Sequence, residues 1–188
     1  MEDPNEAPDT ELAARAGAGD TAAFGALVRR HQIAAVRLAT IISGSPDEAP
    51  DIVQEAFVKA YRALGSRPVP DKVRSWMLRI VANEAHNSRR GRDRRTRRDD
   101  RYAAWSEFDS VDTMTAALSA VEAGTLLAAI GRLHARDREV IGYRYFAGLN
   151  ELETAAAVGT AIGTVKSRTA RALERLRKDL HAGGWSHG

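Results

Sequence analysis

The side chains with the clearest chemical potential lie near the end of the chain, just after a glycine-containing turn. Lys166, Ser167, Arg168 and Arg171 open a segment with helical spacing, in which they share one exposed face. Cations and a hydroxyl at the start of a helix suit contact with nucleic acid, because they can reach phosphate oxygens and base edges. A solvated basic helix in a bundle would show the same spacing, so this cluster alone leaves both interpretations open.

The segment that must position these residues, 151–177, predicts two short helices joined by a tight turn. Gly159 suits the left-handed conformation that ends the first helix, and Thr164 is expected to cap the second. The side chains expected to face the core are Leu152, Ala155, Ala156, Val158, Val165, Ala172, Leu173 and Leu176. The pattern predicts a helix-turn-helix, whose second helix enters the major groove with its early residues.

Composition favours helices throughout. The 188 residues are 44% hydrophobic but only 6% aromatic, and alanine, the strongest helix former, is abundant. No alternating strand pattern is present. We therefore predict an all-α chain of two small helical domains joined by a flexible linker. The expected bounds are a disordered arm at 1–9, a first domain at 10–98, the linker at 99–117, a helix-turn-helix domain at 118–181 and a tail at 182–188.

The charge distribution indicates a polyanionic partner. The net charge is only +3, but arginines cluster within 89–101 and again within 166–178. The absence of cysteine excludes disulfides, thiolate metal sites and cysteine nucleophiles. The five histidines lack metal-ligand spacing, so we predict no metal, no cofactor, no small-molecule substrate and no enzymatic activity. No apolar run approaches a membrane span, and the acidic N-terminus is unlike a signal peptide, which predicts a cytoplasmic protein.

Within the first domain, four helices are expected. One covers Thr10 to Ala18, the next is capped by Asp20 and runs to about Ile42, and the third begins at Pro50, which fits only the first turn. This third helix carries an apolar stripe opposite Asp51, Gln54, Glu55 and Lys59, a face that spacing alone would leave to solvent. After a proline-stiffened loop at 65–71, the fourth helix starts near Lys72 and continues into a run of arginines.

Three segments in this order resemble one family: DIVQEAFVKAYRAL, then RSWMLRIVANEAHNSRR, then GTVKSRTARALERLR. Together, their QEAF, W-x-x-x-I-x-x-N and GTVKSR patterns are similar to those of the extracytoplasmic-function (group IV) sigma factors of bacterial RNA polymerase. The resemblance covers about 24–98 and 126–178. It implies a sigma factor that binds polymerase core enzyme, at the clamp helices of the largest subunit and at the flap, and directs promoter-specific transcription initiation. A further partner that it suggests is an anti-sigma protein.

The resemblance also implies site residues. The polymerase-docking surface is expected at Asp51, Gln54, Glu55 and Phe57. Capture of the unwound minus-ten element is expected from Arg67, Asp71, Lys72, Arg74, Asn83, Arg89 and Arg90. Reading of the duplex minus-thirty-five element is expected from Thr164, Lys166, Ser167, Arg168 and Arg171. Against the family pattern, Thr154, Thr160 and Thr169 replace aliphatic residues, which predicts a repacked second core unless their hydroxyls bond to backbone.

A free-standing helix-turn-helix regulator is the alternative. It would explain residues 151–177 and the basic isoelectric point, but not a whole first domain with its own basic helix. Such regulators usually dimerise to read two half-sites, and the sequence shows no heptad seam. Promoter binding that requires polymerase core would separate the two hypotheses.

Overall fold

The structure, a computed structural model, describes residues 7–96 and 120–182, and both ranges are built from helices. The expected linker at 99–117 and most of the terminal arm and tail lie outside these residues. The first half contains α1 (Asp9–Gly17), α2 (Thr21–Ser43), α3 (Ala49–Leu64) and α4 (Val73–Thr96). Within the described ranges, the prediction of an all-α chain is confirmed.

Local signals fix the helix ends in the first half. The Asp20 carboxylate accepts a hydrogen bond of 3.0 Å from the Ala23 amide and so caps α2, as predicted. Gly44 ends this helix in the left-handed conformation, with φ of 74°. Pro50 lies in the first turn of α3, where its missing N–H costs nothing. The inward positions of α1 are also as expected, since Leu12 and Ala16 are buried.

The second half contains α5 (Ala120–Arg132), α6 (Ala135–Ile141), the π-helical turn η1 (Gly142–Phe146), α7 (Glu151–Val158) and α8 (Ile162–Ala182). The α-helix α6 thus continues directly into the wider π-helical turn η1. Arg138 is buried and bonds to the end of α5, with Nη1 donating to the carbonyls of Gly131 at 3.1 Å and Leu133 at 3.3 Å. These bonds satisfy C-terminal carbonyls that the helix itself leaves unpaired.

The helix-turn-helix forms with a different register from the expected one. Gly159 is left-handed, with φ of 71°, as predicted. Asn150 and Glu153 form a reciprocal capping box at the start of α7. However, α8 begins at Ile162, so Thr164 lies inside the helix and the prediction of a Thr164 cap is wrong. Its amide bonds to the Ala161 carbonyl instead.

Three residues expected in the core of this motif are exposed: Leu152, Ala156 and Leu173. The reason is that α7 packs between α4 and α8 and turns Thr154, Ala155 and Ala157 inward. The predicted burial of Val165, Ala172 and Leu176 is confirmed. The hydrophobic periodicity of the sequence predicted the helices correctly. Which face of α7 is buried depends on its packing against α4, which the periodicity does not show.

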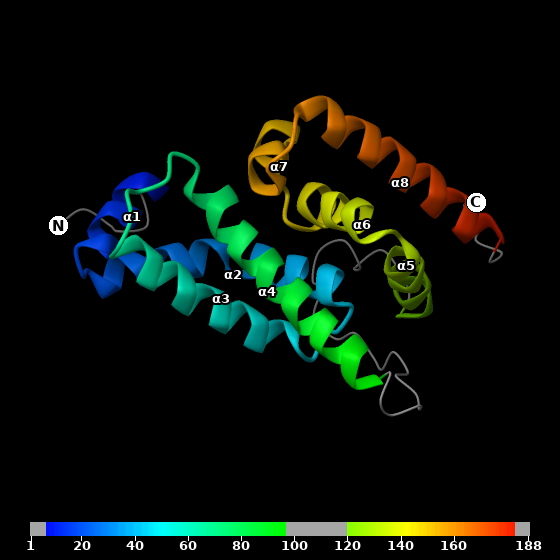
Figure 1. Cartoon of the computed structure of the whole chain (residues 1–188), viewed down its shortest axis with the longest axis horizontal. Helices are drawn as coiled ribbons and strands as arrows, with labels where there is room; N and C mark the ends of the chain where they lie inside the picture. Colours follow the sequence, from blue (N-terminus) through cyan, green and yellow to red (C-terminus); the bar gives the residue numbers. More distant parts are fainter. Residues whose placement is uncertain (1–6, 97–119, 183–188) are drawn as a thin grey trace.

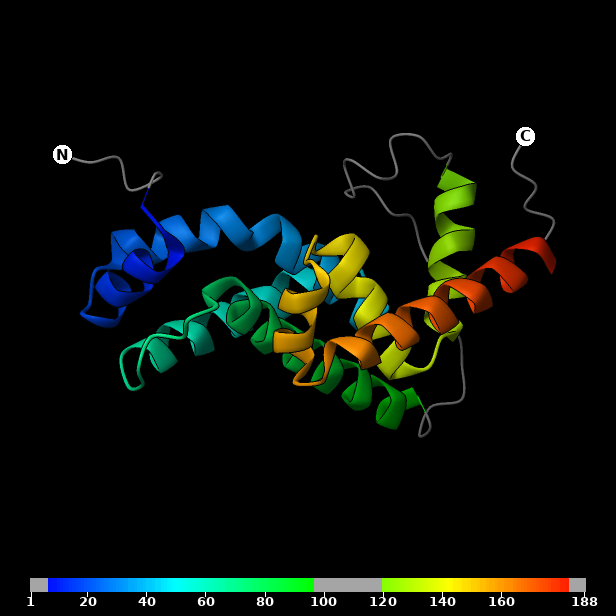
Figure 2. The same cartoon turned by 90° about the horizontal axis from the view of Figure 1, so that it is seen from above.

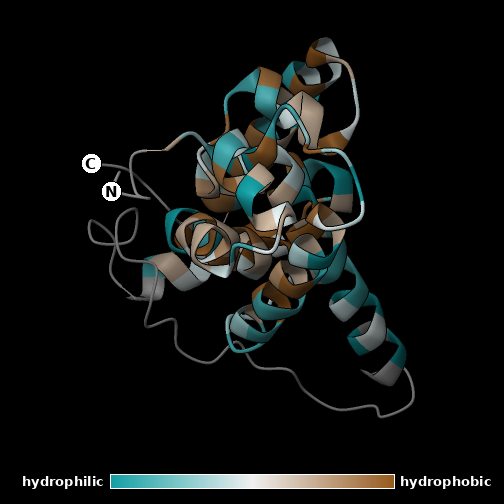
Figure 3. Ribbon diagram, turned by 90° about the vertical axis from the view of Figure 1, so that its left-hand side faces the viewer, coloured by the Kyte–Doolittle hydropathy of each residue, from teal (hydrophilic) through white to brown (hydrophobic). Residues whose placement is uncertain are grey.

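The two halves pack directly on each other, a contact that the sequence did not predict. Figures 1 and 2 show α6 and α7 lying along α2 and α4, with α3 on the side away from them. Tyr143, Ala147, Leu149 and Ala157 belong to the same buried cluster as the core of α1–α4. Coloured by hydropathy, the helices carry their apolar residues largely where they face one another (Figure 3). The molecule therefore has one main core that both halves share.

Candidate protein and nucleic-acid interfaces

The expected docking helix α3 presents a polar ridge to solvent. Asp51, Gln54 and Glu55 are exposed, one turn or less apart. Phe57 was expected on the same surface, but only 7% of it is accessible. The ring points into the seam between α2 and α3 because its position falls on the apolar stripe of the helix. The structure thus brings three of the four predicted docking residues together at the surface.

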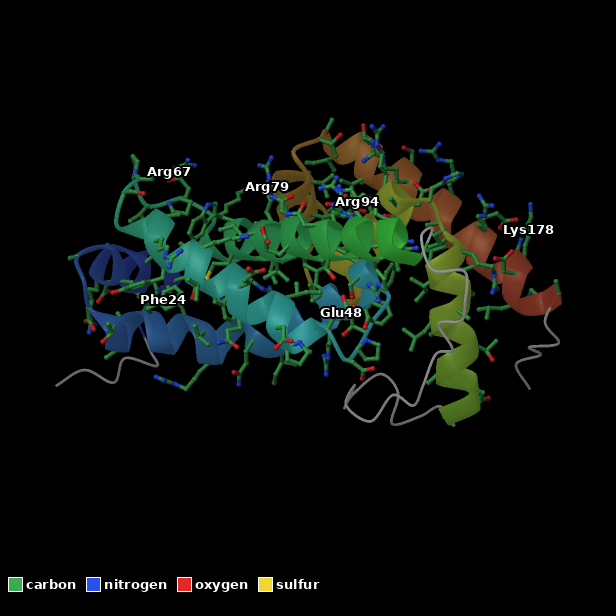
Figure 4. The ribbon with its side chains drawn as sticks, turned by 60° about the horizontal axis from the view of Figure 1, so that its bottom comes forward. Phe24, Glu48, Arg67, Arg79, Arg94 and Lys178 are labelled. Carbon is green, nitrogen blue, oxygen red and sulfur yellow. The ribbon has the colours of Figure 1, made fainter. Side chains whose placement is uncertain are left out.

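Phe57 instead helps to form an apolar groove beside the ridge. The groove has a volume of about 690 Å³ between α2 and α3, and its apolar lining comprises Phe24, Val28, Val36, Pro50, Val53, Phe57, Val58 and Tyr61. The Phe24 and Tyr61 rings meet there with centroids 5.0 Å apart, and Figure 4 labels Phe24 between the two helices. Apolar surface next to polar side chains is typical of protein-binding sites.

Ion pairs hold α3 against α4. The Lys59 ammonium lies 2.5 Å from the Glu84 carboxylate. Glu48, just before α3, accepts a hydrogen bond from Ser88 and lies 3.5 Å from the Arg92 guanidinium. These contacts fix the polar ridge relative to the basic helix behind it. The ridge is therefore mounted on a rigid element, which favours a preorganised binding surface.

A basic stripe runs along the exposed side of α4 and the residue before it. We define this α4 stripe as Lys72, Arg79, Asn83 and Arg90, all exposed and spaced seven, four and seven residues apart on one helical face. Arg79 was not among the predicted contacts, although its spacing from Lys72 and Asn83 was a sufficient signal. Figure 4 labels Arg67, Arg79 and Arg94 along the loop and the helix. Arg67 and Asp71 are exposed in the loop that precedes the helix.

Two predicted strand-capturing residues do not join this stripe. Arg74 is half-buried, and its Nη2 donates a 2.6 Å hydrogen bond to the Ala147 carbonyl in the second half. Arg89 is also half-buried and reaches the Ile42 carbonyl at the end of α2, 3.5 Å away. Their positions on α4 lie off the stripe, toward α2 and η1. The structure therefore separates seven predicted residues into an exposed set of five and a pair used within the fold.

The predicted duplex-reading residues lie at the exposed start of α8. Lys166 and Ser167 are exposed, whereas Thr164 and Arg168 are half-buried. Lys166 lies 3.5 Å from Glu151 in α7, but both side chains are largely solvated, so the pair contributes little stability. Arg171 is exposed and its Nε donates to the Ser167 carbonyl at 3.2 Å. The arrangement leaves cations available at one face of the helix.

The hydroxyls of Thr169 and Thr154 in the second half differ in their hydrogen bonding. The Thr169 hydroxyl bonds to the Val165 carbonyl at 2.9 Å, as expected for a threonine inside a helix. Thr154 is fully buried, and its hydroxyl has no hydrogen-bond partner among the described residues. An unpaired buried hydroxyl typically costs about 1–3 kcal/mol. The core around Thr154 is thus repacked at a cost in stability.

The exposed surface of α8 carries ion pairs within the helix itself. Hydrogen bonds from Arg177 hold the pKa of the Glu174 carboxyl below its usual value, and Lys178 adds to this effect. Both contacts are solvent-exposed ion pairs within one helix. Across residues 7–96 and 120–182, no group of three or more histidines or carboxylates is placed to hold a metal ion. In the same ranges, none of the helices is long and apolar enough to cross a bilayer.

Comparison with known proteins gives the family of both halves. Residues 27–95 match the family Sigma-70 region 2, and residues 129–178 match Sigma-70, region 4. The RNA polymerase sigma factor NccH of Alcaligenes xylosoxydans is 33% identical over 94% of this chain and 95% of that protein. The ECF RNA polymerase sigma factor SigM of Mycobacterium tuberculosis is 35% identical over 94% of this chain and 86% of its own length.

Solved structures agree with this assignment. CnrH in complex with the cytosolic domain of CnrY has a TM-score of 0.66 and 30% identity, covering 93% of this chain and 97% of CnrH. The sigma factor RpoE from Bartonella quintana, bound to the anti-sigma factor NepR, has a TM-score of 0.68 and 27% identity, covering 84% and 96%. Two sigma-70 families, in order, and full-length relatives thus converge on one conclusion. The chain belongs to the extracytoplasmic-function family of RNA polymerase sigma factors.

Proposed function

We propose that this sigma factor divides promoter recognition among three surfaces. The α3 ridge, Asp51, Gln54 and Glu55, docks on the clamp helices of the polymerase largest subunit. The loop 67–71 and the α4 stripe hold the unwound non-template strand of the minus-ten element. The start of α8, from Thr164 to Arg171, reads the duplex minus-thirty-five element while the second half contacts the flap. Polymerase carries out the chemistry, so the chain needs no cofactor and acts in the cytoplasm.

The observation that carries this proposal is the placement of two unlike surfaces on one rigid four-helix unit. The α3 ridge carries carboxylates and an amide beside an apolar groove, which suits a protein partner. The α4 stripe is cationic and has no aromatic ring of its own, which suits phosphates and polar contacts to bases more than stacking. A duplex-binding regulator without polymerase would have no use for the first surface.

The solved relatives suggest one more partner. RpoE is bound to an anti-sigma factor in its structure, and CnrH is bound to the cytosolic domain of CnrY. We therefore infer that an anti-sigma protein also binds this chain. The apolar groove between α2 and α3 is a candidate for part of that contact, because it adjoins the α3 ridge.

Charge reversal on the ridge tests the docking surface. We expect Asp51→Arg and Gln54→Arg each to abolish association with core enzyme, and with it run-off transcription, while circular dichroism stays unchanged. Glu11→Arg is the matched control, because Glu11 is an exposed carboxylate on α1 whose nearest cation lies 4.0 Å away. Undiminished core binding by both ridge variants would contradict the docking surface. Tight binding to promoter duplex without core would favour the free-standing regulator.

A further inference from the structure

A small polar groove lies where α4 passes α6, and it shares only Asn83 and Arg90 with the α4 stripe. The groove has a volume of about 470 Å³, which falls in the range of about 300–1,000 Å³ that is typical of small-molecule sites. Its α4 wall consists of Asn83, His86, Asn87 and Arg90, and its α6 wall of Ala135, Arg136 and Glu139. Apart from Ala135 the lining is polar, so a ligand of this groove would be bound by charge and hydrogen bonds.

Two exposed arginines, Arg90 and Arg136, line the groove from opposite walls. The Arg90 Nη2 donates a 2.6 Å hydrogen bond to the side-chain oxygen of Asn87, which orients the guanidinium and leaves its other N–H groups for a ligand. Arg136 makes no ion pair or hydrogen bond with another residue in the described part of the chain. Like charges on the two walls repel each other, and an anion between them would remove this repulsion.

The carboxylate of the lining does not cancel this positive charge. Glu139 is half-buried, and its Oε2 lies 3.7 Å from the His86 Nε2 on the other wall. When His86 is protonated, the two charges of this pair balance each other. When His86 is neutral, the two arginines still outnumber the carboxylate. The lining therefore carries a net positive charge in both protonation states of His86, which favours an anionic ligand.

The hydrogen-bond donors of the groove indicate which kind of anion would fit. Guanidinium groups bind phosphate oxygens in a bidentate manner, and the side-chain amides of Asn83 and Asn87 offer further N–H donors. Two guanidiniums on opposite walls suit an anion that is charged at both ends, such as two linked phosphates. A DNA strand fits less well, because single strands occupy about 4–16 nucleotides of a channel, and several nucleotides exceed a groove of about 470 Å³.

We propose that this groove binds a small anion made of linked phosphates, either free pyrophosphate or the phosphates of a nucleotide. Arg90 binds one end of the anion and Arg136 the other. Because the anion contacts both α4 and α6, its binding stabilises the folded chain in the arrangement in which these helices are neighbours. The site goes beyond the proposed function, since neither polymerase nor promoter takes part in it.

Titration of the full chain with inorganic pyrophosphate tests the site. Isothermal titration calorimetry should give one pyrophosphate per chain, and the midpoint of thermal unfolding should rise with the pyrophosphate concentration. Sodium chloride at equal ionic strength is the reference, because it screens charges without bridging the two walls. ADP and GDP, titrated separately, distinguish the two sources of linked phosphates: a nucleotide is the ligand if either binds more tightly than pyrophosphate, and the free anion is the ligand if neither does.

Substitutions in the α6 wall test the geometry and the sign of the charge. Arg136→Ala should weaken pyrophosphate binding by about 10-fold or more, because it removes a charged hydrogen-bond donor. Arg136→Lys should restore only part of the loss, since lysine lacks the planar fork. Glu139→Gln should instead tighten binding, because it removes the carboxylate of the lining. Arg29→Ala is the matched control, because Arg29 is an exposed arginine on α2 that does not line the groove.

Three results would overturn the site: stabilisation no greater than with sodium chloride, equal losses in Arg136→Ala and Arg29→Ala, or weaker binding by Glu139→Gln. A single-stranded DNA oligonucleotide of randomised sequence gives a further comparison. If it depended on Arg136 as strongly as pyrophosphate does, the groove would belong to a nucleic-acid strand and the small-anion site would be excluded. Run-off transcription with core enzyme tests the proposed function separately, because a chain that binds pyrophosphate but fails to initiate would contradict only the sigma function.

Discussion

The two halves of this sigma factor differ in how far each is stabilised by its own core. The first half fully buries large side chains from α1, α2 and α4, among them Leu12, Leu27, Leu38 and Met77, and α3 adds nearly buried ones such as Leu64. The second half has a smaller cluster, around Ile130, Leu133, Ile141 and Leu176, to which Ile41 of α2 also contributes, and a very small one formed by Val140, Ala155 and Val165. Its largest buried side chain, Tyr143, lies in the core of the first half.

This difference indicates that the second half depends on the first half for part of its stability. Units of about 60 residues bury little surface and are marginal when alone. The unpaired buried hydroxyl of Thr154 lowers the stability of the second half further. If the second half moved away from α2 and α4, it would lose the contacts of Tyr143 and Leu149, and a new partner would have to replace them. The proposed contact with the polymerase flap would meet this need.

The sharpest way to test this comparison is to truncate one core residue in each half. Leu27→Ala should lower the free energy of unfolding by about 2–5 kcal/mol and loosen both halves, because Leu27 lies in the shared core. Leu176→Ala should cost less, because Leu176 lies in the smaller cluster at 7% exposure. Urea unfolding with amide hydrogen exchange resolved for each half gives the measurement. Faster exchange across α1–α4 in Leu176→Ala would contradict the asymmetry.

The second prediction concerns an ion-pair cluster that strengthens only the first half. Asp9 at the start of α1 lies 2.8 Å from His31 and 2.5 Å from Arg30 on α2. The hydrogen bond from His31 is the main cause that keeps the pKa of the Asp9 carboxyl below its usual value, although burial opposes it. Asp9→Asn should therefore cost about 1.5–3 kcal/mol near neutral pH.

The pH dependence of this effect has a definite sign. A carboxyl whose pKa is lowered by folding contributes its full stability above its unfolded value, here 3.8, and loses it as the pH falls through the lower folded value. The difference in the free energy of unfolding between Asp9→Asn and the unchanged chain should thus shrink below about pH 4. Glu11→Gln is the control, because its carboxylate is exposed and 4.0 Å from Arg15. A difference that persists unchanged at pH 2 would exclude the ionised cluster as the cause.

The third prediction separates specificity from affinity within the second half. Arg168→Ala should relax the preference for one base pair of the upstream element by about 1–3 kcal/mol, as expected for loss of a bidentate contact to guanine. Lys166→Ala should weaken binding evenly across sequences and reduce the salt dependence, because a lysine mainly contacts phosphate. Transcription with core enzyme across a randomised promoter library measures both effects. Equal, sequence-independent losses would remove the base-reading role of Arg168.

Much of the fold could be predicted because its signals are local. The Asp20 cap, the first turn of α3 around Pro50 and the left-handed Gly159 each follow from one residue and its immediate neighbours. The exposed ridge on α3 was predictable for a similar reason, since an apolar stripe on one face leaves the other to solvent. The family resemblance then supplied the roles, which spacing by itself could not.

What could not be predicted depends on contacts between distant segments. Leu152 and Leu173 have apolar side chains at helical spacing, yet both are exposed, because α7 and α8 turn other faces toward their neighbours. Arg74 resembled a strand-binding cation, but the approach of η1 gives it a carbonyl partner. Gly142 gave no sequence signal, although its missing side chain lets η1 approach α2. The misses at Arg74 and Gly142 both concern the packing of one half on the other.

The smallest expected effect tests the contact between the halves through a single hydroxyl. Tyr143→Phe removes the 3.4 Å bond to the Leu78 carbonyl and leaves the ring in place, so we expect a loss of about 0.5–1.5 kcal/mol near neutral pH. Tyr143→Ala is the contrasting variant, since it also empties the ring position and should cost about 3–5 kcal/mol.

At alkaline pH, Tyr143→Phe should become more stable than the unchanged chain, which is the reverse of the order expected near neutral pH. Burial is the main cause that raises the pKa of Tyr143 far above its usual value of 10.0, and the nearby Glu139 carboxylate adds to the effect. A group whose pKa is raised by folding gives its full stability below its unfolded pKa and loses it as the pH rises, because only the unfolded chain then ionises readily. The unchanged chain should therefore lose stability above about pH 10 relative to Tyr143→Phe, which has no proton to lose at this position. If the free energies of unfolding of the two proteins instead changed in parallel with pH, Tyr143 would have to be accessible to water. That result would contradict the burial of Tyr143 between the two halves.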